Sequence, residues 1–144
     1  MKAKELNKIV HVSESQIQRA AVHWFRIVHR DIEPLFFSVP NGGYRCATTA
    51  RIMKAEGQRA GVADLILLVP RQGYCALCIE MKTRKGYQSD AQKVFQKKCE
   101  EYGAKYVVCR SLDEFQKVVR WYLGEEKSET AHNRSLLRSF CSGG

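Results

Sequence analysis

Two apolar runs joined by a short turn decide the fold of this chain: Ala63-Asp-Leu-Ile-Leu-Leu-Val69 and Tyr74-Cys-Ala-Leu-Cys-Ile-Glu-Met-Lys82. Both runs are nearly continuously apolar, which is typical of central strands that are covered on both faces. Between them, Pro70-Arg-Gln-Gly73 is rich in turn-forming residues and predicts an antiparallel hairpin. The sequence therefore predicts a pair of buried strands within a larger sheet.

The segment before this hairpin predicts a helix, a strand and a second helix. Ser13 and Gln16 form a capping-box pattern, after which apolar residues recur at helical spacing up to about His29. Residues 35–39 predict a short strand, because they are largely apolar and lead into a Pro-Asn-Gly-Gly turn. Residues 46–56 fit a helix that is ended by a glycine.

The segment after the hairpin predicts a helix, a strand and a last helix. Ser89 can cap a helix over residues 90–102, followed by a strand over 105–110. The face of this helix that we expect to be buried consists of Ala91, Val94, Phe95 and Tyr102. Ser111 and Glu114 form another capping-box pattern at the start of the last helix. The order α-β-α-β-β-α-β-α predicts an α/β protein, with a mixed sheet between two layers of helices.

Length and composition predict one small globular domain. The chain has 144 residues, of which 44% are hydrophobic and 27% charged, and we expect the domain to occupy residues 1–124. Residues 125–144 are polar and end in Ser-Gly-Gly, which predicts a poorly ordered tail.

No run of about 18 apolar residues is present, so we expect no membrane span. Without a secretory signal, the cysteines are expected to be reduced thiols of a cytoplasmic protein.

Three charged residues stand at one end of the predicted hairpin. Antiparallel pairing brings Asp64, at the start of the first strand, beside the end of the second strand. Glu80 and Lys82 lie two residues apart, so they share one face of that strand. The spacing leaves two interpretations open, because these are common residues that can also be solvated at a strand end. In the other interpretation, the three groups compensate one another around a bound ion.

The second interpretation suits phosphodiester hydrolysis. Carboxylate oxygens bind hard cations such as Mg²⁺ or Mn²⁺, which keep several waters and also bind phosphate. Such a cation polarises a phosphoryl oxygen and lowers the pKa of a bound water, while a lysine stabilises developing negative charge. Glu14 and Gln18 lie one turn apart on the first helix, beside its apolar stripe, and Glu14 can supply another carboxylate. The alternative for Glu14 is a simple interaction with the helix dipole.

Several ordered motifs resemble the VRR-NUC nuclease domain, a branch of the PD-(D/E)XK or restriction-endonuclease-like superfamily. They are Ser13-Glu14-x-x-Ile17-Gln18, Val39-Pro-Asn-Gly-Gly43, Gly61-Val-Ala-Asp-Leu-Ile66, Ile79-Glu-Met-Lys82, Gln92, and Gly103 before a Val-Val strand. The resemblance covers residues 13–123 and implies the restriction-endonuclease-like fold. One departure from the superfamily pattern is that Ala63 stands where proline usually precedes the aspartate.

The resemblance also implies roles for individual residues. Asp64 and Glu80 would be metal ligands, together with the backbone carbonyl of Met81, and Lys82 would be the catalytic lysine. Glu14 would contact the metal directly or through water. Gln18 and Gln92 would support the site.

The formal net charge of +9 favours a polyanionic partner, and nucleic acid first. The basic residues near the predicted site that we expect to contact DNA phosphates are Arg45, Arg51, Lys54, Arg59, Lys85 and Lys93. Each of them taken singly is also compatible with a plain solvated surface charge. Tyr44 and Tyr87 lie in loops near the site and can either stack on an unpaired base or pack on the protein.

The combined expectation is a Mg²⁺- or Mn²⁺-dependent endodeoxyribonuclease. The resemblance to stand-alone phage and bacterial VRR-NUC proteins implies a homodimer that resolves four-way junctions or related branched DNA in the cytoplasm. Two active sites related by a two-fold axis suit a junction with two symmetric cuts. Exposed apolar surface for a dimer is expected at Trp121 with Tyr122, or on the strand Leu35–Phe37. The alternatives are a monomeric flap or general DNA nuclease, and a non-catalytic DNA-binding module.

Overall fold

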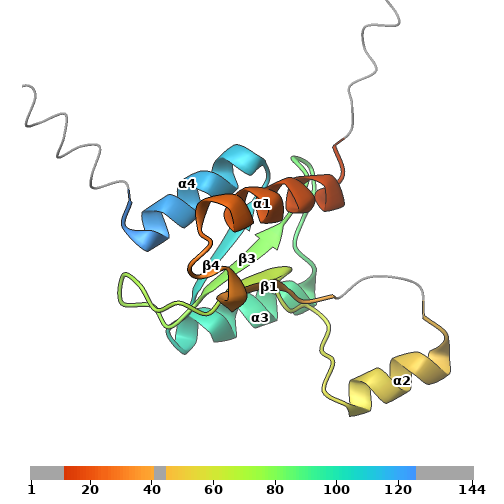
Figure 1. The fold of residues 1–144 in the computed structure, drawn as a ribbon. Coiled ribbons are helices and arrows are strands. Elements are labelled where there is room, and N and C mark those ends of the chain that lie inside the picture. The colour runs from red at the N-terminus through yellow and green to blue at the C-terminus, as the bar shows by residue number, and fades with distance from the viewer. Residues whose placement is uncertain (1–11, 41–44, 126–144) are drawn as a thin grey trace, which may run out of the picture.

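The computed structural model describes residues 12–40 and 45–125 and shows a sheet between helices (Figure 1). The elements are α1 (Glu14–Val28), the 3₁₀ helix η1 (Glu33–Leu35), β1 (Phe36–Ser38), α2 (Ala47–Ala55), β2 (Leu65–Leu67), β3 (Leu77–Met81), α3 (Asp90–Glu101), β4 (Lys105–Cys109) and α4 (Leu112–Leu123). The predicted order of helices and strands is confirmed. Of the expected tail, residues 125–144, the structure describes Glu125, and residues 126–144 lie outside the described part of the chain. None of the described helices has the length and apolar character that a membrane crossing requires.

The sheet is mixed, as predicted, with the strand order β1-β2-β3-β4. The β2–β3 hairpin is antiparallel, and Leu65 lies opposite Ile79 in its register. β1 pairs antiparallel with β2, whereas β4 pairs parallel with β3. β3 is therefore an interior strand, and all five of its residues are buried. This register sets which residues meet at the end of β3.

Helices cover the two faces of the sheet unequally. α1 and α4 lie side by side on one face, and α3 lies on the other (Figure 1). The α1/α4 face holds the main core, whose helical members are Ile17, Ala21, Phe25, Phe115, Val119 and Tyr122. The α3 face has a much smaller core, formed by Ala63, Cys78 and Tyr106. The main core therefore fixes α1 against the sheet, and α1 begins beside the end of β3.

The prediction for the buried face of α3 was wrong in part. Phe95 is half-buried against Tyr106, at a ring distance of 6.3 Å. Ala91, by contrast, is exposed, and Val94 and Tyr102 are 62% and 78% exposed. The physical reason is that, within residues 12–40 and 45–125, no second helix lies beside α3 on this face of the sheet, so a narrow stripe of the helix is covered.

The helix caps follow the sequence closely, with one difference. Ser13 and Gln16 form the predicted reciprocal capping box at the start of α1, with hydrogen bonds of 3.2 and 2.8 Å. At the start of α4, Ser111 accepts a hydrogen bond from the backbone N–H of Glu114, as expected. The Glu114 carboxylate, however, accepts the backbone N–H of Arg110 at 2.7 Å instead of returning to Ser111. This bond ties the end of β4 to the first turn of α4.

None of the nine residues of α2 is buried; α3 has no fully buried residue either, but α3 covers a face of the sheet and α2 does not (Figure 1). α2 projects from the body of the molecule between β1 and β2 (Figure 1). Its end agrees with the prediction, since Gly57 follows it with a φ of +103°, a backbone conformation that glycine adopts readily. At its base, Arg45 donates to Gln58 at 2.9 Å, and Gln58 donates to the Pro40 carbonyl at 3.2 Å. These polar contacts hold the two ends of the projecting segment together.

Candidate active site

The β2–β3 register brings Asp64 to the end of β3. Asp64 directly precedes β2, and its Oδ2 accepts a hydrogen bond from the backbone N–H of Met81 at 2.7 Å. Its backbone carbonyl accepts the N–H of Val39, so Asp64 is also held by the chain just after β1. The structure therefore places the Asp64 carboxylate beside Glu80, the neighbour of Met81, as the predicted hairpin requires.

Glu80 is a buried carboxylate with an incomplete set of partners. Its side chain is 1% exposed, and its Oε1 accepts hydrogen bonds from Gln92 at 2.6 Å and from Lys82 at 3.2 Å. Its Oε2 is buried and has no hydrogen-bond partner among the described residues. Burial, followed by the charge of the nearby Asp64 carboxylate, raises the pKa of Glu80 to about 7. An unpaired buried carboxylate oxygen beside a second carboxylate is an arrangement that a cation would relieve.

The pKa of Asp64 is also raised, and burial is again the main cause. The Met81 N–H, Glu80 and the Lys82 ammonium act in the opposite direction and lower it. Because both members of the pair have raised pKa values, the two adjacent negative charges are not fully compensated by the protein itself. A divalent cation bound between the two carboxylates would supply the missing positive charge.

Lys82 completes the cluster on the same side of β3 as Glu80. Lys82 is 8% exposed, and its Nζ lies 3.2 Å from Glu80 Oε1 and 4.0 Å from Glu14 Oε1. Its backbone N–H donates to the Cys109 carbonyl at 2.9 Å, so the parallel pairing with β4 fixes its position. The ammonium is thus held between one buried carboxylate and one partly exposed carboxylate of α1.

Three further predicted residues reach this cluster from the helices. Glu14 in the first turn of α1 and half-buried Gln18 line the same cavity as Asp64. Gln92 in α3 donates to Glu80, while its Oε1 accepts the Ser89 N–H at 2.8 Å in the α3 capping box. One glutamine side chain therefore both caps α3 and orients the buried Glu80 carboxylate.

The backbone conformation and close packing at position 61 explain why the Gly61-Val-Ala-Asp motif begins with glycine. Gly61 has a φ of +84°, and a Cβ at this position would lie 2.5 Å from the backbone carbon of Ala91. Only glycine allows so close an approach between the loop and the first turn of α3. The motif therefore packs the loop that carries Asp64 against the helix that carries Gln92.

The sequence prediction missed the loop that follows Lys82. One nitrogen of the Arg110 guanidinium donates to the carbonyls of Thr83 and Gly86, both at 2.7 Å, and more weakly to that of Arg84 at 3.3 Å. A Cβ on Gly86 would lie 3.3 Å from both Glu14 Oε1 and the Lys82 side chain, so this loop lies against the cluster. No local signal identifies Arg110, because its partners lie more than 20 residues away in sequence.

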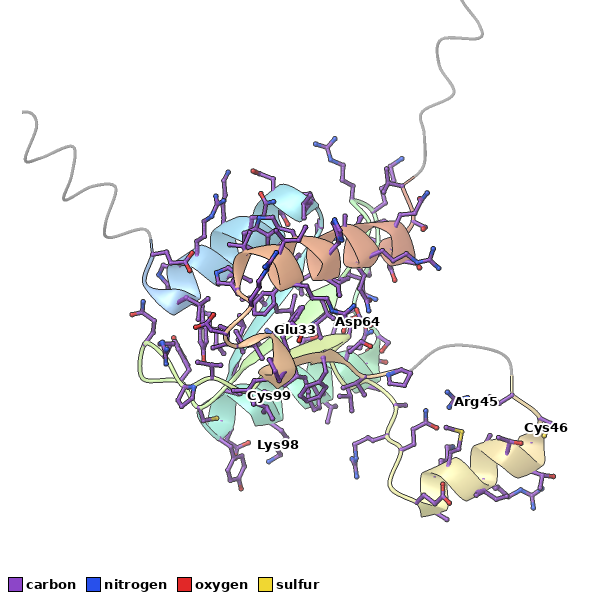
Figure 2. All side chains as sticks on the ribbon, viewed as in Figure 1. Glu33, Arg45, Cys46, Asp64, Lys98 and Cys99 are labelled. Atoms are coloured by element: carbon purple, nitrogen blue, oxygen red, sulfur yellow. The ribbon has the colours of Figure 1, made fainter. Side chains whose placement is uncertain are left out.

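The predicted DNA-binding residues fall into two groups. Lys85 is exposed in the loop beside Lys82, and Lys93 is exposed in the first turn of α3 at 4.0 Å from Asp90. The second group belongs to the segment that contains α2 and consists of Arg45, Arg51, Lys54 and Arg59. Figure 2 shows Arg45 on this projecting segment, well away from Asp64. The structure does not bring this second group to the carboxylates.

Of the two loop tyrosines that were predicted near the site, the structure describes one. Tyr87 is 87% exposed. Tyr44 and the Asn-Gly-Gly turn before it lie outside the described residues. Among the described residues the cysteines form no disulfide; Cys78 and Cys109 are buried and Cys99 is half-buried, whereas Cys46 and Cys75 are exposed.

Sequence and fold comparisons agree on what this domain is. The mixed sheet with its carboxylate–lysine cluster defines a nuclease domain of the restriction-endonuclease-like fold, whose substrate is DNA. The sequence profile of the VRR-NUC domain matches residues 12–113, and the chain belongs to this family. A solved structure described as a VRR-NUC domain protein superimposes with a TM-score of 0.69 at 24% identity, covering 78% of this chain and 89% of the other. The curated proteins gave no significant match.

Nucleases of this fold generally depend on divalent metal ions, and the residues here fit such an ion. Within residues 12–40 and 45–125, no three His, Cys, Asp or Glu side chains gather closely enough to enclose a cation by themselves. Asp64 and Glu80 form a pair, and Glu80 Oε2 is buried without a partner in that part of the chain. A small carboxylate set suits Mg²⁺ or Mn²⁺, because these ions keep several waters and take further ligands from substrate phosphate. The donor set thus agrees with the metal requirement of the family.

Proposed function

We propose that this chain is a Mg²⁺- or Mn²⁺-dependent, structure-selective endodeoxyribonuclease that resolves four-way junctions or related branched DNA. It would act as a homodimer in the cytoplasm of a bacterial or phage-infected cell. The observation that carries the proposal is the buried Glu80 carboxylate. One of its oxygens is held by Lys82 and Gln92, while the other oxygen has no partner among the described residues.

Asp64 and Glu80 would hold the metal, with the Met81 carbonyl as a further ligand, and Glu14 would contact it directly or through water. The bound ion would supply a polarised phosphoryl oxygen and a water of lowered pKa. Gln92 fixes Glu80 from one side, and the Met81 N–H fixes Asp64 from the other, so the two carboxylates are oriented before substrate arrives. This preorganisation is what a phosphodiester hydrolase requires of its metal ligands.

Lys82 would act on the substrate from within the cluster. Its ammonium lies between Glu80 and Glu14, at the end of β3. There it can donate to the scissile phosphate or orient the attacking water. Hydrolysis by metal-activated water would leave a 5′-phosphate and a 3′-hydroxyl, as in the superfamily.

The surface suggests where two copies could meet. Tyr122 cannot contribute, contrary to one of the two predictions, because it is fully buried and its hydroxyl donates to the Val69 carbonyl at 2.6 Å. Leu35 and Leu68 are 43% and 49% exposed, and the Leu68 N–H donates to the Leu35 carbonyl at 3.0 Å. These adjacent apolar side chains beside the edge strand β1 support a dimer contact at this edge.

The test is a cleavage assay on labelled four-way junction, flap, single-stranded and duplex DNA. The wild type, Glu80→Ala and the control Asp113→Asn are compared with Mn²⁺, Mg²⁺ or EDTA, and light scattering gives the mass in solution. Asp113 is an exposed residue of α4 that pairs with Lys117, far from the cluster in sequence. We expect symmetric junction cuts by a dimeric wild type and by Asp113→Asn, which are lost with EDTA and in Glu80→Ala. Flap cutting by a monomer, equal cutting of every substrate, or binding without cutting would each contradict the proposal.

A further inference from the structure

The turn that follows Lys82 contains no large apolar residue that would hold it in place. It consists of residues that are all at least partly exposed: Thr83, Arg84, Lys85 and Gly86. A backbone hydrogen bond from the Gly86 N–H to the Thr83 carbonyl closes the turn at 3.1 Å. The positive charges of Arg84 and Lys85 repel each other and the Lys82 ammonium, which favours an open chain. The closed form of the 83–86 turn therefore needs stabilisation from another part of the domain.

The Arg110 side chain supplies this stabilisation from the residue after β4. Its Nη1 donates to the carbonyls of Thr83 and Gly86, both at 2.7 Å, and to that of Arg84 at 3.3 Å. Hydrogen bonds from a charged donor are stronger than those between neutral groups. The backbone N–H of Arg110 is in turn held by the Glu114 carboxylate at 2.7 Å. Arg110 thus connects both ends of the turn to the body of the domain.

The closed turn forms one wall of the space that the Lys82 side chain occupies. A Cβ on Gly86 would lie 3.3 Å from the Lys82 Cδ and 3.3 Å from Glu14 Oε1, so the Gly86 backbone packs against both groups. In Figure 1 the segment that joins β3 to α3 accordingly passes the N-terminal part of α1. Lysine has high rotamer freedom and is rarely buried, so Lys82 would move into solvent if this wall opened.

We propose that Arg110 is a positioning residue for the nuclease reaction. It holds the 83–86 turn closed, and the closed turn keeps the Lys82 ammonium between Glu80 and Glu14. The inference rests on the proposed function and deepens it, because it assigns the placement of the catalytic lysine to a side chain that does not itself contact the cluster.

The two carboxylates that would bind the metal are held independently of Arg110. Asp64 accepts the Met81 N–H at 2.7 Å, and Glu80 accepts the Gln92 amide at 2.6 Å. Loss of the Arg110 side chain should therefore displace Lys82 and leave the metal ligands in place. This separation distinguishes a positioning role from a general structural role.

The placement of Lys82 is measured first, in EDTA and without DNA. The wild type, Arg110→Met and the control Arg71→Met are treated with an amine-acylating reagent, and mass spectrometry gives the labelling rate of each lysine. Arg71 lies in the hairpin turn at the end of the strands opposite Asp64, where it donates to the Pro70 carbonyl at 2.8 Å. The exposed Lys117 of α4 is the internal reference.

We expect Lys82 of Arg110→Met to be labelled about 5- to 10-fold faster, relative to Lys117, than in the wild type and in Arg71→Met, because local opening of the turn exposes it. Arg110→Lys is the conservative variant. Since a single guanidinium nitrogen makes the contacts with the turn, a lysine ammonium replaces part of them, and its labelling rate should lie between those of the wild type and Arg110→Met. Equal labelling of Lys82 in the wild type and Arg110→Met would overturn the proposal.

The catalytic consequence is measured by single-turnover cleavage of branched DNA at saturating DNA and Mn²⁺. Arg110→Met should lower the rate about 10- to 100-fold, because a displaced catalytic group loses its alignment with the substrate. Its Mn²⁺ affinity, from titration calorimetry, should equal that of the wild type. Loss of Mn²⁺ binding would assign Arg110 a general structural role and overturn the proposal.

A double variant shows whether Arg110 acts through Lys82. Adding Arg110→Met to Lys82→Met should lower the cleavage rate no further, because the group that Arg110 positions is already absent. Losses of rate that multiply in the double variant would contradict the proposal.

Failure of this proposal is distinguishable from failure of the nuclease function. A wild type that cuts DNA no faster than Arg110→Met keeps the function and loses the positioning role. A wild type that never cuts with any metal, but whose Lys82 is protected from labelling only while Arg110 is present, loses the function and keeps the placement of Lys82 by Arg110.

Discussion

The end of β3 and the α2 segment both carry charged residues that are predicted to act on DNA, the first in cleavage and the second in binding. The two regions differ in how far these residues are buried. At the end of β3, Glu80 and Lys82 are buried and held by hydrogen bonds from two strands and a helix. In α2 no residue is buried, and polar contacts at its base hold the segment. Burial fixes charged groups to fractions of an ångström, whereas exposed basic side chains attract phosphates over a wide range of positions.

This difference separates two kinds of contribution. Under the proposed function, substitutions at the end of β3 should act on the chemical step, because they alter groups that are held rigidly where the reacting phosphate would bind. Substitutions in α2 should act on DNA affinity and its salt dependence. The four predictions below follow this comparison, in decreasing order of expected effect.

Lys82→Met should reduce the single-turnover rate of cleavage about 10²- to 10³-fold at saturating Mg²⁺, because it removes a positive charge beside the scissile phosphate. Single-turnover kinetics on labelled junction DNA measure this effect. Lys117→Met is the matched control, since Lys117 is an exposed lysine that pairs with Asp113 in α4. Equal rates for Lys82→Met and the wild type would show that the buried ammonium has no part in the chemistry.

Glu80→Gln should change how the stability of the metal-free protein depends on pH. The pKa of Glu80 is raised to about 7 from its ordinary value of 4.5, so the folded state binds this proton more tightly than the unfolded state. The resulting stabilisation is complete below about pH 4.5 and is lost as the pH rises toward 7. Relative to the variant, the wild type should therefore lose roughly 1–3 kcal/mol of unfolding free energy across this window.

Denaturant unfolding in EDTA at several pH values measures this change. Glu101→Gln is the control, because Glu101 is exposed and its carboxylate pairs with Lys98 at 2.9 Å on the surface of α3. The control should show the same pH profile as the wild type. Parallel profiles for the wild type and Glu80→Gln would mean that the buried carboxylate does not carry the charge that the metal is inferred to balance.

Gln92→Leu should lower cleavage about 10- to 100-fold, because the amide that orients Glu80 is lost. This residue also caps α3, so its helix-capping role must be separated from its contact with Glu80. Gln16→Leu removes the equivalent cap from α1 without a bond to the cluster and serves as the control. Cleavage rates and melting temperatures of both variants separate the capping role of Gln92 from its contact with Glu80. A similar loss of rate in both would assign the Gln92 effect to capping alone.

Arg51→Gln and Lys54→Gln should weaken DNA binding only a few-fold each and leave the saturated cleavage rate unchanged. Each should lower the salt slope of binding by about one if the side chain contacts a phosphate. Affinity measured over a salt series gives this slope, with Arg71→Gln as a control. A large fall in the saturated cleavage rate would remove the distinction between the two regions.

The sequence was sufficient to predict the parts of this domain that depend on local patterns. Capping residues predicted the starts of α1 and α3, and the apolar hairpin predicted that Asp64 and Glu80 would meet. Residue spacing within a strand likewise placed Lys82 on the side of Glu80. These features follow from periodicity and turn chemistry, which act over a few residues.

Features that depend on distant segments were not predictable in this way. The Arg110 contacts with the loop after Lys82 join residues that only the parallel β3–β4 pairing brings close. Val94 and Tyr102 are exposed because no other helix in the described part of the chain lies beside α3. The residue pattern of one helix does not reveal this. The projection of α2 away from Asp64, visible in Figure 2, is likewise a property of tertiary packing.

The most direct test of the central claim is Mn²⁺ binding at the end of β3, measured by titration calorimetry on the wild type, Asp64→Asn, Glu80→Gln and the control Asp113→Asn. The account predicts a Mn²⁺ site in the wild type and in Asp113→Asn that is lost or strongly weakened in both cluster variants. Equal Mn²⁺ binding by all four proteins, or none by the wild type, would contradict it.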